Sequence, residues 1–223
     1  MKKWPNLLRA CLLMLLVMLT TLFFTEKVQA AGLPFQVKAE LSTAQRVDNE
    51  SYFDVVVGAG QSTPLKVTLT NTSNEAVKVN VTFASAQTND NGIVDYTGSQ
   101  KDDVSLTYKL ADLITGDQKI TIPANGSYTY TATLTMPNQA YDGMIAGALI
   151  FKPVDDDTTS SSVSGMSVVN KFQYALPIIT RNENITWQPK LEIKSTKMVQ
   201  RGSKANVVVK IRNTTATFLN QLK

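Results

Sequence analysis

Residues 60–83 form two short runs in which apolar and polar residues alternate. The stretch reads GQSTPLKVTLTNTSNEAVKVNVTF, and its alternating apolar positions are Leu65, Val67, Leu69, Val77, Val79, Val81 and Phe83. Every second side chain of an extended chain points to the same side, so each run predicts a strand with one face in a core and one in water. The polar residues 71–75 between the runs favour a turn. We therefore expect two strands of one antiparallel sheet.

Further strand-like runs follow at short spacing along the chain. They are PFQVKAEL from residue 34, YFDVVV from residue 52, KITIP from residue 119, SYTYTATLTM from residue 127 and MIAGALIF from residue 144. Only a short segment around KLADLI, residues 109–114, suggests a helix. Many short strands separated by turn residues predict an all-β sandwich rather than an α/β fold.

The first 30 residues have the pattern of a secretory signal. Lys2, Lys3 and Arg9 precede an apolar run over residues 10–24, and the small-residue sequence Val-Gln-Ala ends at Ala30. The apolar run is shorter than the roughly 20 residues that a membrane-spanning helix needs. We therefore expect a signal peptide over residues 1–30, a mature N-terminus at Ala31, and an extracellular protein.

Charge and residue usage narrow the classes of function. The predicted signal carries four of the 22 Lys and Arg residues and one of the 18 Asp and Glu residues, so removing it lowers the net charge from +4 to +1. A nearly neutral chain without a run of clustered cations makes nucleic acid an unexpected partner. The chain has no histidine, and its single cysteine, Cys11, lies in the predicted signal. Nucleophiles that depend on histidine and the usual zinc ligands are therefore excluded, and we expect no enzyme activity, cofactor or metal.

A weak internal repeat suggests two related domains. GQSTPLKVTLTNTS, starting at Gly60, aligns without gaps with GSKANVVVKIRNTT, starting at Gly202. Together with the polar link TRNENIT at residues 180–186, the alignment predicts a first sandwich over residues 31–181 and the N-terminal part of a second over residues 182–223. About 40 residues are near the lower limit for a fold without disulfides or metals, so we expect the second sandwich to be incomplete here.

A long connection and a nearby turn supply candidate ligand contacts. About 35 residues separate the strand that ends near residue 84 from the one that starts near residue 119, which is long for a loop in a compact domain. The amide, carboxylate and aromatic side chains of this loop and of the turn before residue 144 suit sugar hydroxyls and peptide amides. The candidates are Asn89, Asn91, Asp95, Tyr96, Tyr141 and Asp142. The alternative is that these residues only stabilise turns and strand ends, for example an Asn-Gly turn at residues 91–92.

Several segments together resemble the WxL-interacting proteins of Gram-positive bacteria. They are LPFQVKAELSTAQ, the run ESYFDVVVGAGQSTPLKVTLTNTSNEAVKVNVTFASAQTNDNGIVDYTG, the segment MPNQAYDGMIAGALIF and the closing YALPIITRN. The resemblance implies a peptidoglycan-binding immunoglobulin-like domain followed by a second such domain that binds host surface proteins. It also implies secreted WxL proteins as partners and a location at the cell wall.

The end of the chain departs from the family pattern. Family members continue through a complete second domain to a C-terminal membrane helix and a basic tail, whereas this sequence stops at Lys223. We therefore expect a truncated or fragmentary chain that lacks the family's membrane anchor.

Two classes of function remain open from the sequence. The first is a non-catalytic cell-wall module that binds glycan and peptide through aromatic stacking and amide hydrogen bonds. The second is a scaffold or adhesin whose exposed sheet edge captures a strand of a partner protein without recognising glycan directly.

Overall fold

The computed structural model describes residue 14 and residues 34–47, 50–89, 91–99, 103, 106–154 and 172–219. The predicted signal peptide therefore lies almost wholly outside the described residues, and its cleavage stays a prediction.

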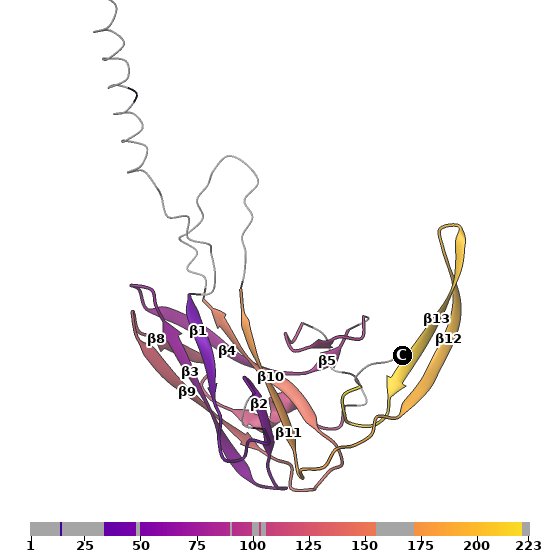
Figure 1. The fold of residues 1–223 in the computed structure, drawn as a ribbon, viewed down its shortest axis with the longest axis horizontal. Coiled ribbons are helices and arrows are strands. Elements are labelled where there is room, and N and C mark those ends of the chain that lie inside the picture. The colour runs from indigo at the N-terminus through magenta and orange to yellow at the C-terminus, as the bar shows by residue number, and fades with distance from the viewer. Residues whose placement is uncertain are drawn as a thin grey trace, which may run out of the picture. The chain divides into compact units, whose positions relative to one another are not determined.

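Nine of the strands form two facing sheets (Figure 1). The four-stranded sheet has the order β1 (Phe35–Glu40), β3 (Ser62–Asn71), β9 (Ser127–Thr135) and β7 (Ile114–Thr115). The five-stranded sheet has the order β2 (Phe53–Val56), β11 (Tyr174–Arg181), β10 (Ile145–Pro153), β4 (Val77–Ser85) and β8 (Lys119–Ile122). All of these pairs are antiparallel except β2 with β11, which is parallel. The predicted all-β, immunoglobulin-like antiparallel sandwich is confirmed.

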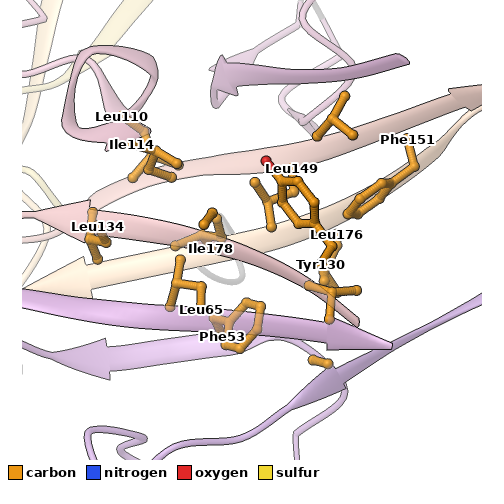
Figure 2. Packing of buried hydrophobic residues seen from close by; sticks show 14 of the residues in the cluster. Phe53, Leu65, Leu110, Ile114, Tyr130, Leu134, Leu149, Phe151, Leu176 and Ile178 are labelled. Atoms are coloured by element: carbon orange, nitrogen blue, oxygen red, sulfur yellow. The ribbon is translucent and has the colours of Figure 1, made fainter. Parts of the chain in front are cut away.

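The core lies between the inner faces of the two sheets (Figure 2). Leu65, Val67 and Leu69 of β3 are fully buried, as their alternation predicts. The rings of Tyr130 on β9 and Phe151 on β10 meet edge to face across the sandwich, with 5.6 Å between ring centroids and 89° between planes. This is a favoured arrangement for an aromatic pair, and it ties the two sheets together.

The two strands that flank residues 72–76 do not pair with each other, so the expectation of one shared sheet is wrong. β3 pairs with β1 and β9, whereas β4 pairs with β10 and β8 in the opposite sheet. Asn71 organises the crossing: its Oδ1 accepts the Ser73 N–H at 2.8 Å, and its Nδ2 donates to the carbonyls of Glu75 at 2.8 Å and Pro123 at 3.0 Å. Alternation determines which side of a strand is buried, but it does not determine the hydrogen-bonding partner.

The long connection between β4 and β8 contains short elements of its own. A hairpin of β5 (Gln87–Thr88) and β6 (Val94–Asp95) comes first, and the helix α2 (Leu110–Leu113) follows at the position expected for KLADLI. Leu110 is fully buried in the main core, so α2 fixes the end of this connection to the sandwich.

The last two strands form a separate two-stranded sheet, drawn in yellow in Figure 1. β12 (Leu191–Arg201) and β13 (Lys204–Asn213) are antiparallel, with a bulge between Ile193 and Ser195 and a turn in which Gly202 has φ of +62°.

The internal repeat recurs as local structure. Gly60 before β3 and Gly202 before β13 both have positive φ, at +71° and +62°. Asn213 at the end of β13 accepts the Thr215 N–H at 3.2 Å and donates to the Thr217 carbonyl at 2.7 Å. Asn71 makes the equivalent bonds two and four residues ahead of itself. The repeat therefore preserves both the entry and the exit of the strand.

Candidate functional site

The β5–β6 hairpin carries three of the predicted contact residues, and two of their side chains hold its turns. Asn89 Oδ1 accepts the N–H groups of Asn91 and Ile93, each at 3.0 Å. Asp95 Oδ1 accepts the N–H of Thr97 at 2.7 Å. The predicted Asn-Gly turn is confirmed, with Gly92 at φ of +77°. The Asn91 side chain is exposed at the tip, where its amide is open to a ligand.

Tyr96 lies directly after this hairpin and is half-buried on the outer face of the five-stranded sheet. Its ring packs against a small apolar cluster of Ala84, Ala148 and Ile150. Burial raises the pKa of the Tyr96 hydroxyl above its usual value, and the hydroxyl of Tyr52 adds to the effect. The phenol of Tyr96 can donate a hydrogen bond, and its half-buried ring offers apolar area.

Tyr141 and Asp142 lie in the turn before β10. The Tyr141 N–H donates to Asn182 Oδ1 at 3.0 Å, and its hydroxyl donates to the Thr180 carbonyl at 3.2 Å. Its ring contacts that of Tyr108, with 5.3 Å between centroids and 47° between planes. Burial raises the pKa of Tyr141 strongly, although the nearby guanidinium of Arg181 opposes the rise.

The structure does not join these two groups into one site. Tyr96 packs on the outer apolar cluster, whereas Tyr141 packs against the main core. Asp142 is exposed next to Tyr141. The two predicted groups therefore pack against different clusters of the sandwich. The aromatic residue whose hydroxyl does influence Tyr96 is Tyr52, which directly precedes β2. Sequence spacing does not predict this interaction, because the two tyrosines are 44 positions apart.

A buried charge cluster at the ends of β2 and β11 was also missed from the sequence. Arg181 and Asp54 pair at 2.5 Å with side chains only 4% and 8% exposed, and Arg46 lies 3.7 Å from the other carboxylate oxygen. Arg46 also donates to Asn184 Oδ1 at 2.7 Å. Removing one partner of such a pair leaves an uncompensated buried charge, at a cost of about 3–5 kcal/mol. The cluster therefore fixes the strand ends next to residues 182–186.

Two glycines of the segment YDGMIAGALIF are required by close packing. Gly143 has φ of +111°, and a side chain there would meet Ala216. The neighbouring N–H of Met144 donates to the Ala216 carbonyl at 2.7 Å. A Cβ at Gly147 would overlap the Ala84 carbonyl oxygen and the Leu110 side chain. The motif is thus explained by backbone approach rather than by ligand chemistry.

Edge strands offer a second kind of binding surface. Within the described part of the chain, β1 ends the four-stranded sheet and β2 ends the five-stranded sheet apart from one bridge between Gln45 and Val55. A shallow groove runs beside these edges. Its lining residues are Val37, Lys38, Ala39, Glu40, Leu41, Glu50, Ser51 and Tyr174.

The described residues form a β-sandwich whose polar surfaces and open strand edges are its candidate contact regions. Among the described residues, no group of three or more His, Cys, Asp or Glu side chains can hold a metal ion, and no helix is long and apolar enough to cross a membrane. The surfaces instead offer amides, phenols and unpaired strand edges, which suit non-covalent recognition.

The chain belongs to the WxL-interacting protein family. The family profile described as "WxL Interacting Protein, peptidoglycan binding domain" matches residues 35–153, and the one described as "WxL Interacting Protein, host binding domain" matches residues 163–223. The predicted family and domain order are confirmed, and both profiles describe binding domains rather than enzymes. The chain is therefore a cell-surface binding protein.

The division between the two profiles differs from the architecture of the sheets. β11 (Tyr174–Arg181) lies within the second matched range, yet it pairs with β10 and β2 of the first sandwich. The predicted division of the chain at residues 181 and 182 stays a prediction.

Solved structures resemble the chain at low sequence identity. The ASH/PapD-like domain of human CEP192 is 10% identical, with 72% of this chain and 94% of that chain covered and a TM-score of 0.40. The class 5 fimbriae chaperone CfaA is 14% identical, with coverages of 82% and 67% and a TM-score of 0.37. The CsuC–CsuE chaperone–tip adhesion subunit complex of Acinetobacter baumannii is 16% identical, with coverages of 72% and 68% and a TM-score of 0.40. None of the curated proteins matches the chain.

Proposed function

We propose that this chain is a non-catalytic module that binds peptidoglycan and is thereby held at the Gram-positive cell wall. The observation that carries the proposal is the match of the peptidoglycan-binding profile to residues 35–153, which include eight of the nine strands of the two facing sheets. Export by the signal over residues 1–30 would deliver the chain to the wall.

The contact surface that we propose is the β5–β6 hairpin with Tyr96 beside it. Asn91 has an exposed amide at the hairpin tip, and Tyr96 combines a neutral phenol with apolar ring area. Amides and hydroxyls bind sugar and peptide groups, and an aromatic ring adds apolar contact. Asn89 and Asp95 shape the hairpin. We assign Tyr141 a structural role, and the exposed Asp142 beside it stays a candidate contact.

Sedimentation with isolated peptidoglycan tests the contact surface. Tyr96→Ala and Asn91→Ala should each weaken retention on peptidoglycan while thermal unfolding shows a folded protein. Gln118→Ala is the matched control for Asn91→Ala, because Gln118 is also an exposed amide but lies between β7 and β8. Normal retention of both folded variants would reject this surface.

Tyr141 requires a separate test because its hydroxyl has a structural partner. Tyr141→Phe should lower stability through loss of that hydrogen bond and leave peptidoglycan retention unchanged. Lost retention with unchanged stability would instead place Tyr141 among the ligand contacts.

We also propose a second role, in which an open sheet edge captures a strand from a secreted WxL protein. β1 has one side without a strand partner among the described residues, and backbone groups on such an edge can pair with an added strand. Amide hydrogen exchange tests this role. Adding a WxL-domain protein should slow exchange in β1, and a complex that forms without slowing exchange there would reject edge capture.

A further inference from the structure

The two faces of the β12–β13 hairpin differ sharply in chemistry. On one face Val207 is opposite Met198 and Ile211 is opposite Ile193, and these four side chains are 48–78% exposed. The other face carries a cluster of cations. They are Lys197, Arg201, Lys204, Lys210 and Arg212, and the register places Val199 and Val208 among them.

The internal repeat identifies what each face corresponds to in the first sandwich. With the repeat aligned, Val207, Val209 and Ile211 match Leu65, Val67 and Leu69. The latter three are fully buried on the inner face of β3. Both copies of the repeat therefore have the apolar face. The cationic face of the hairpin corresponds to the outward, solvated face of β1 and β3.

The cations are what the second copy adds. In the same alignment Lys204, Lys210 and Arg212 take the places of three neutral hydroxyl residues. These residues are Ser62, Thr68 and Thr70. On β12, Lys197 lies opposite Val208. At the equivalent place in the first sandwich, the acidic Glu40 lies opposite Lys66. The outward face of the first sandwich folds without these charges, so the strand pair does not need them for its structure.

The charge is also concentrated and incompletely paired. Residues 190–213 contain seven of the 22 Lys and Arg residues of the chain and one of its 18 Asp and Glu residues. Arg212 pairs with Asp103 at 3.2 Å, and Glu192 pairs with Lys194 at 2.9 Å. The remaining cations of the face have no ion-pair partner among the residues that the structure describes. Arg201 lies directly opposite Lys204, an arrangement of like charges that disfavours the hairpin.

We propose that this outward face of β12 and β13 binds a linear sulfated polysaccharide of the host surface. From Lys204 to Arg212 the cations extend along about 27 Å of strand, which is longer than a single small anion and suits a polymer with repeated charges. The match of the host-binding profile to residues 163–223 favours a host glycan, so the proposal rests on the host-binding role of this region. A membrane surface fits less well, because the most exposed apolar side chains, Met198, Ile193 and Val207, lie on the face opposite the cations.

Heparin is the probe for the test, with unsulfated hyaluronan and poly(glycerol phosphate) as comparison polymers. The purified chain should bind heparin at about physiological salt and more tightly than either comparison polymer, and the affinity should fall with added salt. Lys204→Gln combined with Lys210→Gln should weaken heparin binding by about tenfold. The same variant should reduce the slope of log affinity against log salt concentration by about two.

The matched control removes the same charge from the first sandwich. Lys38→Gln combined with Lys66→Gln alters exposed lysines on the outward face of β1 and β3, so it should leave heparin binding within about twofold of the unmodified chain. Equal losses for both double variants would mean that net charge alone is responsible and would overturn the proposal. Hyaluronan or poly(glycerol phosphate) binding as tightly as heparin would overturn it as well.

Attachment to host cells separates this proposal from the host-binding role itself. If the chain attaches to cells and the hairpin variant attaches equally well, the sulfated-glycan proposal fails and the host-binding role stands. If heparin binds through the hairpin but the chain attaches to no host cell, the host-binding role is rejected. The host surface is then also rejected as the source of the sulfated polysaccharide.

Discussion

The packing of β4 gives the sharpest test of the sandwich, through a pair of substitutions at neighbouring positions. Val79 is 1% exposed and faces the core between β10 and β8, whereas Lys78 is exposed on the opposite face. Val79→Asp and Lys78→Asp introduce the same carboxylate one residue apart, so their difference reports the direction of the side chain.

The expected difference is large. Val79→Asp loses about 1.5–3 kcal/mol of apolar burial and adds an unpaired buried charge, which costs several kcal/mol more. The sum approaches the whole stability of a typical domain, about 5–15 kcal/mol. Lys78→Asp should change the free energy of unfolding by less than about 1 kcal/mol.

Urea denaturation followed by circular dichroism measures this difference. Val79→Thr is a milder companion because it keeps the branched shape and buries only a hydroxyl, so it should lie between the two Asp variants. Equal unfolding midpoints for the Asp variants would refute the assigned faces of β4.

The remaining predictions concern other buried groups. Tyr130→Phe should be neutral or stabilising, because the Tyr130 hydroxyl is buried without a hydrogen-bond partner among the described residues; calorimetry measures this. Burial raises the pKa of Tyr130 to about 12, so this tyrosine ionises at lower pH in the unfolded chain than in the folded one. Stability should therefore fall as the pH rises from about 10 towards about 12. Urea midpoints should show a less steep fall in Tyr130→Phe. Asp54→Ala should cost about 3–5 kcal/mol by leaving Arg181 unpaired, and an unchanged urea midpoint would contradict this. Gly147→Ala should lower the melting temperature, because a Cβ there overlaps the Ala84 carbonyl.

Much of the sandwich follows from local patterns. The alternating segments correctly predict the strands and their buried sides, as in β9, where Tyr130, Ala132 and Leu134 are buried and the threonines between them are exposed. A period of two sets the side on which residues lie whatever strand is adjacent, so this information is local. The partner of a strand is not local: β3 and β4 are joined by five residues and still belong to different sheets.

The candidate site was less predictable because it depends on contacts between distant segments. Tyr52 adds to the rise that burial causes in the pKa of Tyr96, and Asp54 pairs with Arg181, which is 127 positions away in the sequence. The cationic face was also not predicted from the sequence, because its lysines and arginines alternate with other residues and come together only when β12 pairs with β13. The asparagine at the end of the repeat was the exception, since Asn71 and Asn213 act through bonds within four residues.

Binding of the purified chain to isolated Gram-positive peptidoglycan tests the central claim most directly. The measurement is sedimentation of the chain at increasing peptidoglycan concentration, with a cysteine-free β-sandwich protein of similar charge as the reference. The wall-binding account predicts saturable retention of the folded chain, with no release of wall fragments. Retention no greater than that of the reference protein, or hydrolysis of the wall, would contradict it.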